Sequence, residues 1–83
     1  MAYTLSWSDN AYKELKRLPV FIQRVIVKKI DEASLNPAHF FTKLVGRPEY
    51  KLRVGDYRVI TRIEHGQLII LVVDVGHRKN IYD

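Results

Sequence analysis

Gly55-Asp56 lies between two stretches in which apolar and polar residues alternate. A two-residue link between alternating stretches is typical of a β-hairpin, and it fixes the register of the two strands. His65-Gly66 joins the second stretch to a third one in the same way. The three stretches span residues 49–54, 57–64 and 67–75. The sequence therefore predicts three consecutive antiparallel strands.

Two helices are expected before these strands. Residues 2–7 alternate between apolar and small or polar side chains, which predicts a short strand. Ser8 is a favourable N-cap for a first helix. Pro19 ends that helix and suits the start of a second one, which Asn36-Pro37 stops. The short link implies an antiparallel helical hairpin. Residues 38–46 are expected to form a connector.

The expected order is strand, helix, helix, strand, strand, strand. It predicts an α+β fold in which the N-terminal strand joins a mostly antiparallel four-stranded sheet, with the helical hairpin packed on one face. A chain of 83 residues has room for one domain, which we expect to span residues 1–83.

Composition excludes several classes of protein. The absence of cysteine excludes disulfides, cysteine nucleophiles and cysteine-bound zinc. No apolar run approaches the ~20 residues that a membrane helix needs, and the N-terminus lacks the basic start of a signal peptide. We therefore expect a cytoplasmic protein with no membrane partner. Fourteen Lys and Arg residues against nine Asp and Glu leave a net charge of +5, which favours an anionic partner such as nucleic acid or an acidic protein.

The hairpin register concentrates positive charge on one face of the predicted sheet. With Gly55-Asp56 as the loop, Arg53 pairs with Arg58, and Glu49 faces Arg62. Side chains alternate across a strand, so four cations share the face opposite the core. These cations are Lys51, Arg53, Arg58 and Arg62. Like charges directly opposite one another are destabilising, so the pattern indicates function rather than stability.

The third predicted strand is apolar on both faces, so we expect it to be central in the sheet. The same pairing rule places Arg58 beside Val73, puts Val75 on the basic face, and puts Asp74 on the core face near Tyr57. A basic face with an apolar floor suits an RNA backbone with stacked bases, or a partner peptide. The alternative is a solvated basic face whose side-chain stems lie over apolar residues.

The last residues after the third strand carry two more cations, Arg78 and Lys79. Arg78 and Tyr82 are four residues apart, so on a helical turn they would share a face. The alternative for this segment is a frayed chain end.

Three segments, in this order and at these spacings, resemble the RelE/ParE superfamily of type II toxins, specifically the RelE-like mRNA interferases. The first is Leu44-Val45-Gly46, and the second runs from Tyr50 to Ile60. The third runs from Val75 to Tyr82 and is similar to the family's closing Gly-His-Arg-x-x-x-Tyr. The resemblance covers almost the whole chain and implies a RelE-like fold.

The resemblance implies a ribosome-dependent endoribonuclease that cleaves mRNA in the A site and inhibits translation. Motif positions imply four catalytic residues, Lys51, Arg58, Arg78 and Tyr82. RNA-binding residues are expected around them, namely Arg53, Arg62, Lys79 and His77. One position departs from the family pattern. Some members carry a second lysine two residues before the first, and this chain has Glu49 there.

These residue types suit RNA cleavage by attack of the 2′-OH on the adjacent phosphate, which needs no metal. Arg58 and Arg78 suit the phosphoryl oxygens, because guanidinium meets phosphate in a bidentate fork. Neighbouring cations disfavour the protonated form of Lys51, which makes it a candidate acceptor of the 2′-OH proton. Tyr82 is a candidate to stack on a base, orient the nucleophile or share the proton transfer. No histidine pair has metal-ligand spacing, so no metal or cofactor is expected.

The resemblance also implies a cognate RelB-like antitoxin, whose acidic amphipathic segment wraps around this protein and blocks or deforms its basic face. The ribosome and mRNA are the other expected partners. Two alternatives stay open. One is a ParE-like toxin that inhibits DNA gyrase by binding, and the other is a catalytically weakened member that binds only RNA or its antitoxin, which Glu49 keeps in consideration.

Overall fold

The structure is a computed structural model that describes residues 2–77. Within these residues, five strands form one sheet in the order β1-β5-β4-β3-β2. The strands are β1 (Thr4–Trp7), β2 (Thr42–Lys43), β3 (Tyr50–Val54), β4 (Tyr57–Glu64) and β5 (Ile69–His77). β1 runs parallel to β5, and the other neighbouring strands are antiparallel. The N-terminal strand thus lies beside the C-terminal one, at the edge opposite β2.

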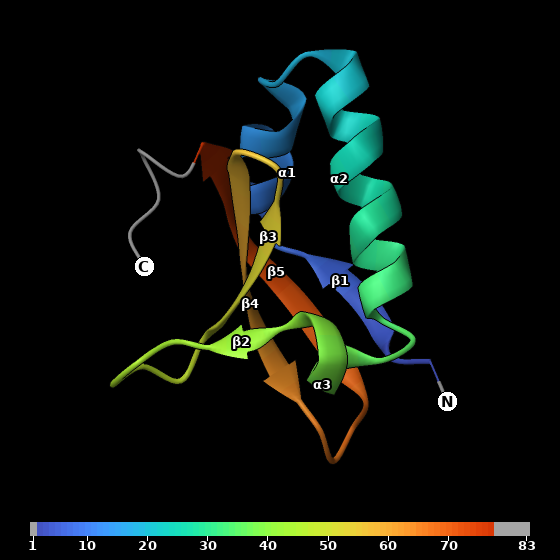
Figure 1. The fold of residues 1–83 in the computed structure, drawn as a ribbon, viewed down its shortest axis with the longest axis vertical. Coiled ribbons are helices and arrows are strands. Elements are labelled where there is room, and N and C mark those ends of the chain that lie inside the picture. The colour runs from blue at the N-terminus through green and yellow to red at the C-terminus, as the bar shows by residue number, and fades with distance from the viewer. Residues whose placement is uncertain (1, 78–83) are drawn as a thin grey trace.

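The helices lie on one side of the sheet (Figure 1). They are α1 (Asp9–Lys16), α2 (Val20–Ala33) and the short α3 (Pro37–Phe40). The Ser8 hydroxyl accepts a hydrogen bond from the Ala11 N–H at 3.0 Å, which confirms the predicted N-cap. Pro19 separates α1 from α2, which form an antiparallel hairpin. No helix within residues 2–77 has both the length and the apolar composition of a membrane span.

The core lies between this helical hairpin and the sheet. The apolar stripe of α2 contributes Ile26 and Ile30, which are almost fully buried. They pack with inward-facing side chains of the three long strands, namely Leu52, Val54, Val59, Ile70, Val72 and Val75. Burial of these aliphatic groups is the main force that holds the hairpin on the sheet.

The predicted α+β fold is confirmed, but the sheet has a fifth strand where a connector was expected. Thr42 pairs with Lys51 and Lys43 with Tyr50, so the short β2 extends the sheet beyond β3. A hydrogen bond of 3.0 Å from the Leu44 N–H to the Glu49 carbonyl closes this second hairpin. A two-residue strand is too short to show an alternating pattern, which is why the sequence did not reveal it.

The β4–β5 connection is also longer than predicted. Leu68 has a φ of 56°, in the left-handed region, so it turns the chain instead of continuing a strand. β5 therefore begins at Ile69 rather than residue 67, and it extends to His77 rather than residue 75.

A β-bulge in β5 reverses the face of the sheet that the residues after it occupy, compared with the prediction. Val72 pairs with Thr61 and Asp74 with Ile60, which leaves Val73 as an extra residue. From there on every residue of β5 faces the side opposite to the predicted one. Val75 is 2% exposed in the core instead of on the basic face, and Asp74 lies on the outer face instead of near Tyr57.

Candidate active site

The outer face of β3 and β4, away from the helices, carries the four cations that the hairpin register predicted. Arg53 pairs directly with Arg58, and Lys51 pairs with Ile60, as expected for a two-residue turn at Gly55-Asp56. Gly55 adopts a φ of 58°, a conformation that glycine accommodates without strain. The turn thereby fixes which side chains share the outer face: Lys51, Arg53, Arg58 and Arg62.

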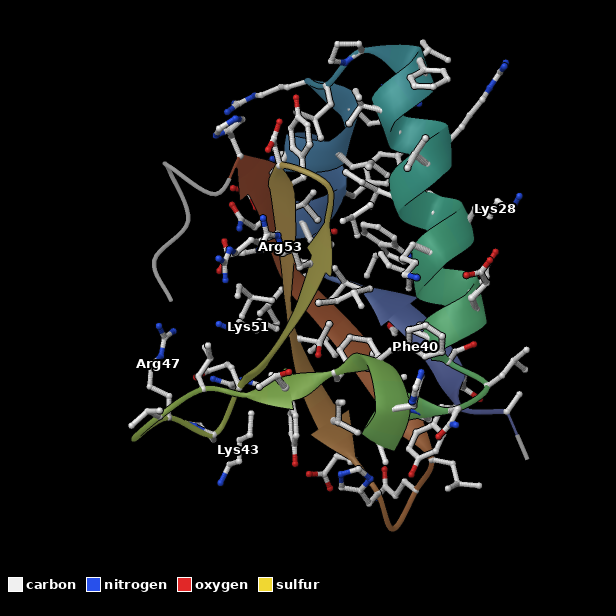
Figure 2. The ribbon with its side chains drawn as sticks, in the orientation of Figure 1. Lys28, Phe40, Lys43, Arg47, Lys51 and Arg53 are labelled. Atoms are coloured by element: carbon white, nitrogen blue, oxygen red, sulfur yellow. The ribbon has the colours of Figure 1, made fainter. Side chains whose placement is uncertain are left out.

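These cations differ in how deeply they lie. Lys51 and Arg58 are half-buried, whereas Arg53 and Arg62 are exposed. The Nε atom of Arg58 is itself buried. Arg53 is held by its own turn, because its Nε donates to the Gly55 carbonyl at 3.3 Å. Figure 2 shows Lys51 and Arg53 projecting from β3 on the side of the sheet away from α2. Lys51 and Arg58 therefore form the deeper part of the basic face.

Ile60 of β4 provides an apolar floor beneath these cations, whereas the sequence predicted that floor from the third strand. It lies on the outer face between Arg58 and Arg62, yet it is only 3% exposed. Asp74 lies opposite Ile60 across the β4–β5 ladder and is half-buried. The corrected register thus places Asp74 at an outer-face position where the sequence had predicted an apolar side chain, and its carboxylate accepts a hydrogen bond from Asn10 of α1.

Gly76 is the β5 residue that pairs with Arg58, in place of the predicted Val73. Glycine has no side chain, so β5 places no bulk on the outer face directly beside the Arg58 backbone. The motif that begins at Gly76 therefore starts next to Arg58. Three of the predicted site residues lie beyond the described residues: Arg78, Lys79 and Tyr82.

His77, which was expected from the sequence to bind RNA, does not lie on the basic face. It pairs with Tyr57, and the two rings meet edge to face with centroids 5.5 Å apart. Tyr57 packs against the hydrophobic core, so both rings lie on the helix side of the sheet. The bulge is the physical reason, because it reverses the face of each β5 residue after Val73.

Glu49 belongs to the same face as Lys51 and forms two ion pairs there. Its Oε1 lies 3.3 Å from Nε of Arg47, and its Oε2 lies 3.7 Å from Nη2 of Arg62. The predicted juxtaposition of Glu49 and Arg62 is thus confirmed. Sequence reasoning missed Arg47, although the charged sequence Arg47-Pro48-Glu49 after a glycine was an available signal of a closed turn.

Polar side chains of α1 hold the bulge of β5. Asn10 Nδ2 donates to the Val73 carbonyl at 3.1 Å and to Asp74 Oδ1 at 2.9 Å. Glu14 Oε1 accepts from the Val75 N–H at 3.0 Å, so it satisfies a strand group that β1 does not reach. These contacts fix the last residues of β5, from which the Gly-His-Arg segment departs.

Burial raises the pKa of the Glu14 carboxyl above its usual range. The neighbouring Asp74 carboxylate adds to the increase, while the hydrogen bond from the Val75 N–H opposes it.

Within residues 2–77, no group of three or more His, Asp or Glu side chains is arranged to hold a metal ion.

Comparison with known proteins identifies the family. A family model described as the ParE toxin of type II toxin–antitoxin systems matches residues 5–82. The chain belongs to the RelE/ParE superfamily of type II toxins. The resemblance inferred from the three sequence segments is therefore confirmed.

Within the RelE/ParE superfamily, the curated relatives are of the RelE type. The chain is 30% identical over 82 residues to the mRNA interferase toxin RelE of Escherichia coli K12, which covers 95% of this chain and 86% of that protein. It is 28% identical to toxin RelG of Mycobacterium tuberculosis over 99% of this chain and 98% of that toxin.

Solved structures of RelE toxins share the fold. The toxin–antitoxin complex RelBE2 of Mycobacterium tuberculosis matches with a TM-score of 0.87 and 25% identity, covering 94% of this chain and 100% of the matched chain. The intact RelBE complex of Escherichia coli matches with a TM-score of 0.77 and 30% identity, covering 92% and 96% respectively.

Proposed function

We propose that this RelE-like toxin is a ribosome-dependent endoribonuclease that cleaves mRNA in the A site and thereby inhibits translation. The observation that carries the proposal is the outer face of β3 and β4, where Lys51, Arg53 and Arg58 lie together over a buried apolar floor. The relatives named mRNA interferases support the choice of substrate.

Cleavage begins when the 2′-OH attacks the adjacent phosphate. The 2′-O–P bond forms, the P–O5′ bond breaks, and the products carry a 2′,3′-cyclic phosphate and a 5′-OH. Negative charge gathers on the phosphoryl oxygens in the transition state, so fixed cations accelerate the step. Arg58 holds these oxygens, because its half-buried side chain lies on the outer face and its Nε atom is buried. Arg78 completes the phosphate clamp in this proposal.

Lys51 transfers the proton in the proposed reaction. It lies on the same face as Arg58, one strand away, and its half-buried position shields it from bulk water. Lys51 accepts the proton from the 2′-OH, and a separate acidic group donates a proton to the leaving 5′-oxygen. Tyr82 stacks on a base, orients the attacking hydroxyl or shares this proton transfer. The proposed step uses no metal ion.

Arg53, Arg62 and Lys79 contribute to binding of the RNA backbone. Arg53 is exposed at the turn end of the hairpin, where it extends the basic face beyond Arg58. Phosphate contacts of this kind raise affinity without reading sequence, and they weaken as salt is added.

The proposed partner is an antitoxin with an acidic amphipathic segment. α2 exposes a row of apolar side chains, including Val20 at 61% and Phe21 at 73%. Lys28, labelled on α2 in Figure 2, lines one hollow of the surface with Val20, Val27 and Arg24. Apolar side chains edged by cations complement such a segment. The matched Escherichia coli and Mycobacterium tuberculosis structures are toxin–antitoxin complexes.

Mapping of mRNA 5′ ends in a translation reaction tests the proposed function. We expect new ends within A-site codons after addition of the protein, and loss of these ends with Arg78→Ala. Lys13→Ala is the matched control, because it removes the same charge from an exposed site on α1, across the sheet. Absence of new ends with the wild-type protein would contradict the proposal, and inhibition that depends on added gyrase would favour the ParE-like activity.

A further inference from the structure

Glu49 is a carboxylate placed within a basic face, and its surroundings show what it does there. It immediately precedes β3 and lies two residues before Lys51, on the same side of the sheet. Its side chain is only 13% exposed, although the two arginines that it contacts are 44% and 65% exposed. Each carboxylate oxygen contacts a different guanidinium, so Glu49 is shared between Arg47 and Arg62.

The two arginines come from different elements. Arg47 lies in the loop between β2 and β3, which projects from the body of the molecule (Figures 1 and 2). Arg62 lies in β4, which neighbours β3 on the side opposite to β2. Backbone hydrogen bonds from Leu44 to Glu49 and from Arg47 to Leu44 close the loop. Glu49 thus holds the loop arginine and the strand arginine together at one end of the basic face.

This arrangement divides the cations of the outer face into two groups. Arg47 and Arg62 are partly neutralised by a carboxylate that would repel a phosphate placed between them. Lys51, Arg53 and Arg58 lie nearer the turn end of the hairpin than the cluster of Arg47, Glu49 and Arg62. Glu49 therefore weakens the attraction of the face for an RNA backbone at the Arg47–Arg62 end.

We propose that Glu49 is a positioning residue that holds Arg47 and Arg62 to each other and weakens their binding to RNA phosphate. The inference rests on the proposed function, since it assumes that this face binds RNA. It also assigns Arg62 a weaker part in RNA binding than the sequence alone suggested.

Binding of a short single-stranded RNA with 2′-O-methyl groups tests this inference, because such RNA cannot undergo 2′-OH attack. Glu49→Gln keeps the shape of the side chain and frees both arginines. We expect it to bind this RNA roughly three- to tenfold more tightly at low salt, with a salt dependence steeper by about 0.7 for each arginine that gains a phosphate. Glu64→Gln is the matched control, since it removes an exposed carboxylate from the same face of β4.

A double-mutant comparison separates the ion pairs from net charge. In an Arg47→Ala/Arg62→Ala background, Glu49→Gln should leave RNA affinity unchanged within about twofold, because the cations that it releases are gone. With ribosomes as substrate, Glu49→Gln should lower KM and leave kcat unchanged, as expected of a residue that acts on binding. Melting temperatures confirm that each variant is folded.

Equal tightening by Glu49→Gln and Glu64→Gln would overturn the inference, because the effect would then be one of net charge. A fall in kcat with Glu49→Gln would also overturn it and would place Glu49 in the chemistry. The outcomes of the binding experiments do not depend on those of the 5′-end mapping. A protein that cleaves no mRNA but shows the expected binding cycle would lose the proposed function and keep the role of Glu49.

Discussion

The two faces of the β3–β4 hairpin are built from alternate residues of the same strands, and they differ in almost every physical property. The helix-covered face carries Leu52 and Val59, which are buried almost completely. The outer face carries Lys51, Arg53 and Arg58, two of which are paired directly across the strands despite their like charge. One face therefore stabilises the fold, and the other retains an arrangement that stability alone would not select.

The comparison shows how a chain of 83 residues separates stability from function. A small domain buries a thin core, so every inward-facing side chain is needed there. The period of two along each strand sends neighbouring residues to opposite faces, and function is placed on the face that the core does not use. Substitutions one residue apart should consequently have effects of different kinds.

Lys51→Ala should have the largest effect that separates the two faces. We expect cleavage at saturating toxin to slow by about 10²- to 10⁴-fold, the usual contribution of a general acid or base. Affinity for 2′-O-methyl RNA should fall by less than about tenfold, since only one phosphate contact is lost. Single-turnover cleavage and a binding titration measure the two effects. Equal losses in both would assign Lys51 to binding alone.

Leu52→Ala, one residue further along β3, should act on stability instead. Leu52 is 2% exposed, so truncation leaves a cavity and costs about 2–4 kcal/mol of the free energy of unfolding. Arg53→Ala, on the opposite face of the same strand, should change this free energy by less than about 0.5 kcal/mol. Urea denaturation of both variants measures the difference. Similar losses would mean that the outer face also stabilises the fold.

Several features of this comparison were predictable from the sequence, because they depend on local geometry. The Gly55-Asp56 turn fixes the pairing of Arg53 with Arg58, and alternation then assigns every side chain of the hairpin to a face. The pairing also predicted that Glu49 lies near Arg62, which the ion pair confirms. The family could be recognised because its motifs coincide with these strands.

Other features depend on contacts between distant residues, which local patterns do not encode. Val73 is extruded as a bulge where Asn10 of α1 bonds its carbonyl, and the pattern of β5 alone gives no sign of this contact. The bulge moved Val75 and Asp74 to the faces opposite those predicted, and it places His77 on the helix side of the sheet. The ion pair of Arg47 with Glu49 likewise depends on the shape of the β2–β3 loop.

Glu14→Gln should have the smallest effect, and it tests how α1 holds the bulge of β5. Because the folded-state pKa of Glu14 is raised, its contribution to stability is complete below the ordinary carboxyl value of 4.5 and is lost as the pH rises through the folded pKa. Glutamine keeps an acceptor for the Val75 N–H and adds a donor toward Asp74. It gives up only the attraction between the ionised carboxylate and the nearby cation Arg17. At neutral pH we therefore expect a melting temperature that is slightly higher than that of the wild type.

The difference between Glu14→Gln and the wild type should shrink as the pH falls toward 4.5, where the wild-type carboxyl becomes protonated. Thermal denaturation across this pH range measures it. A variant that is less stable than the wild type at every pH would contradict this prediction and would make the ionised carboxylate the stabilising form.

The rate of mRNA cleavage by Arg58→Ala, measured in a single turnover on programmed ribosomes, tests the central claim most directly. Arg58 lies on the outer face, opposite Gly76 and beside the start of the closing motif. We expect a rate lower by about 10²- to 10³-fold, as for removal of a group that stabilises transition-state charge, with an unchanged melting temperature. A rate equal to that of the wild type in a folded Arg58→Ala variant would contradict the assignment of cleavage to this face.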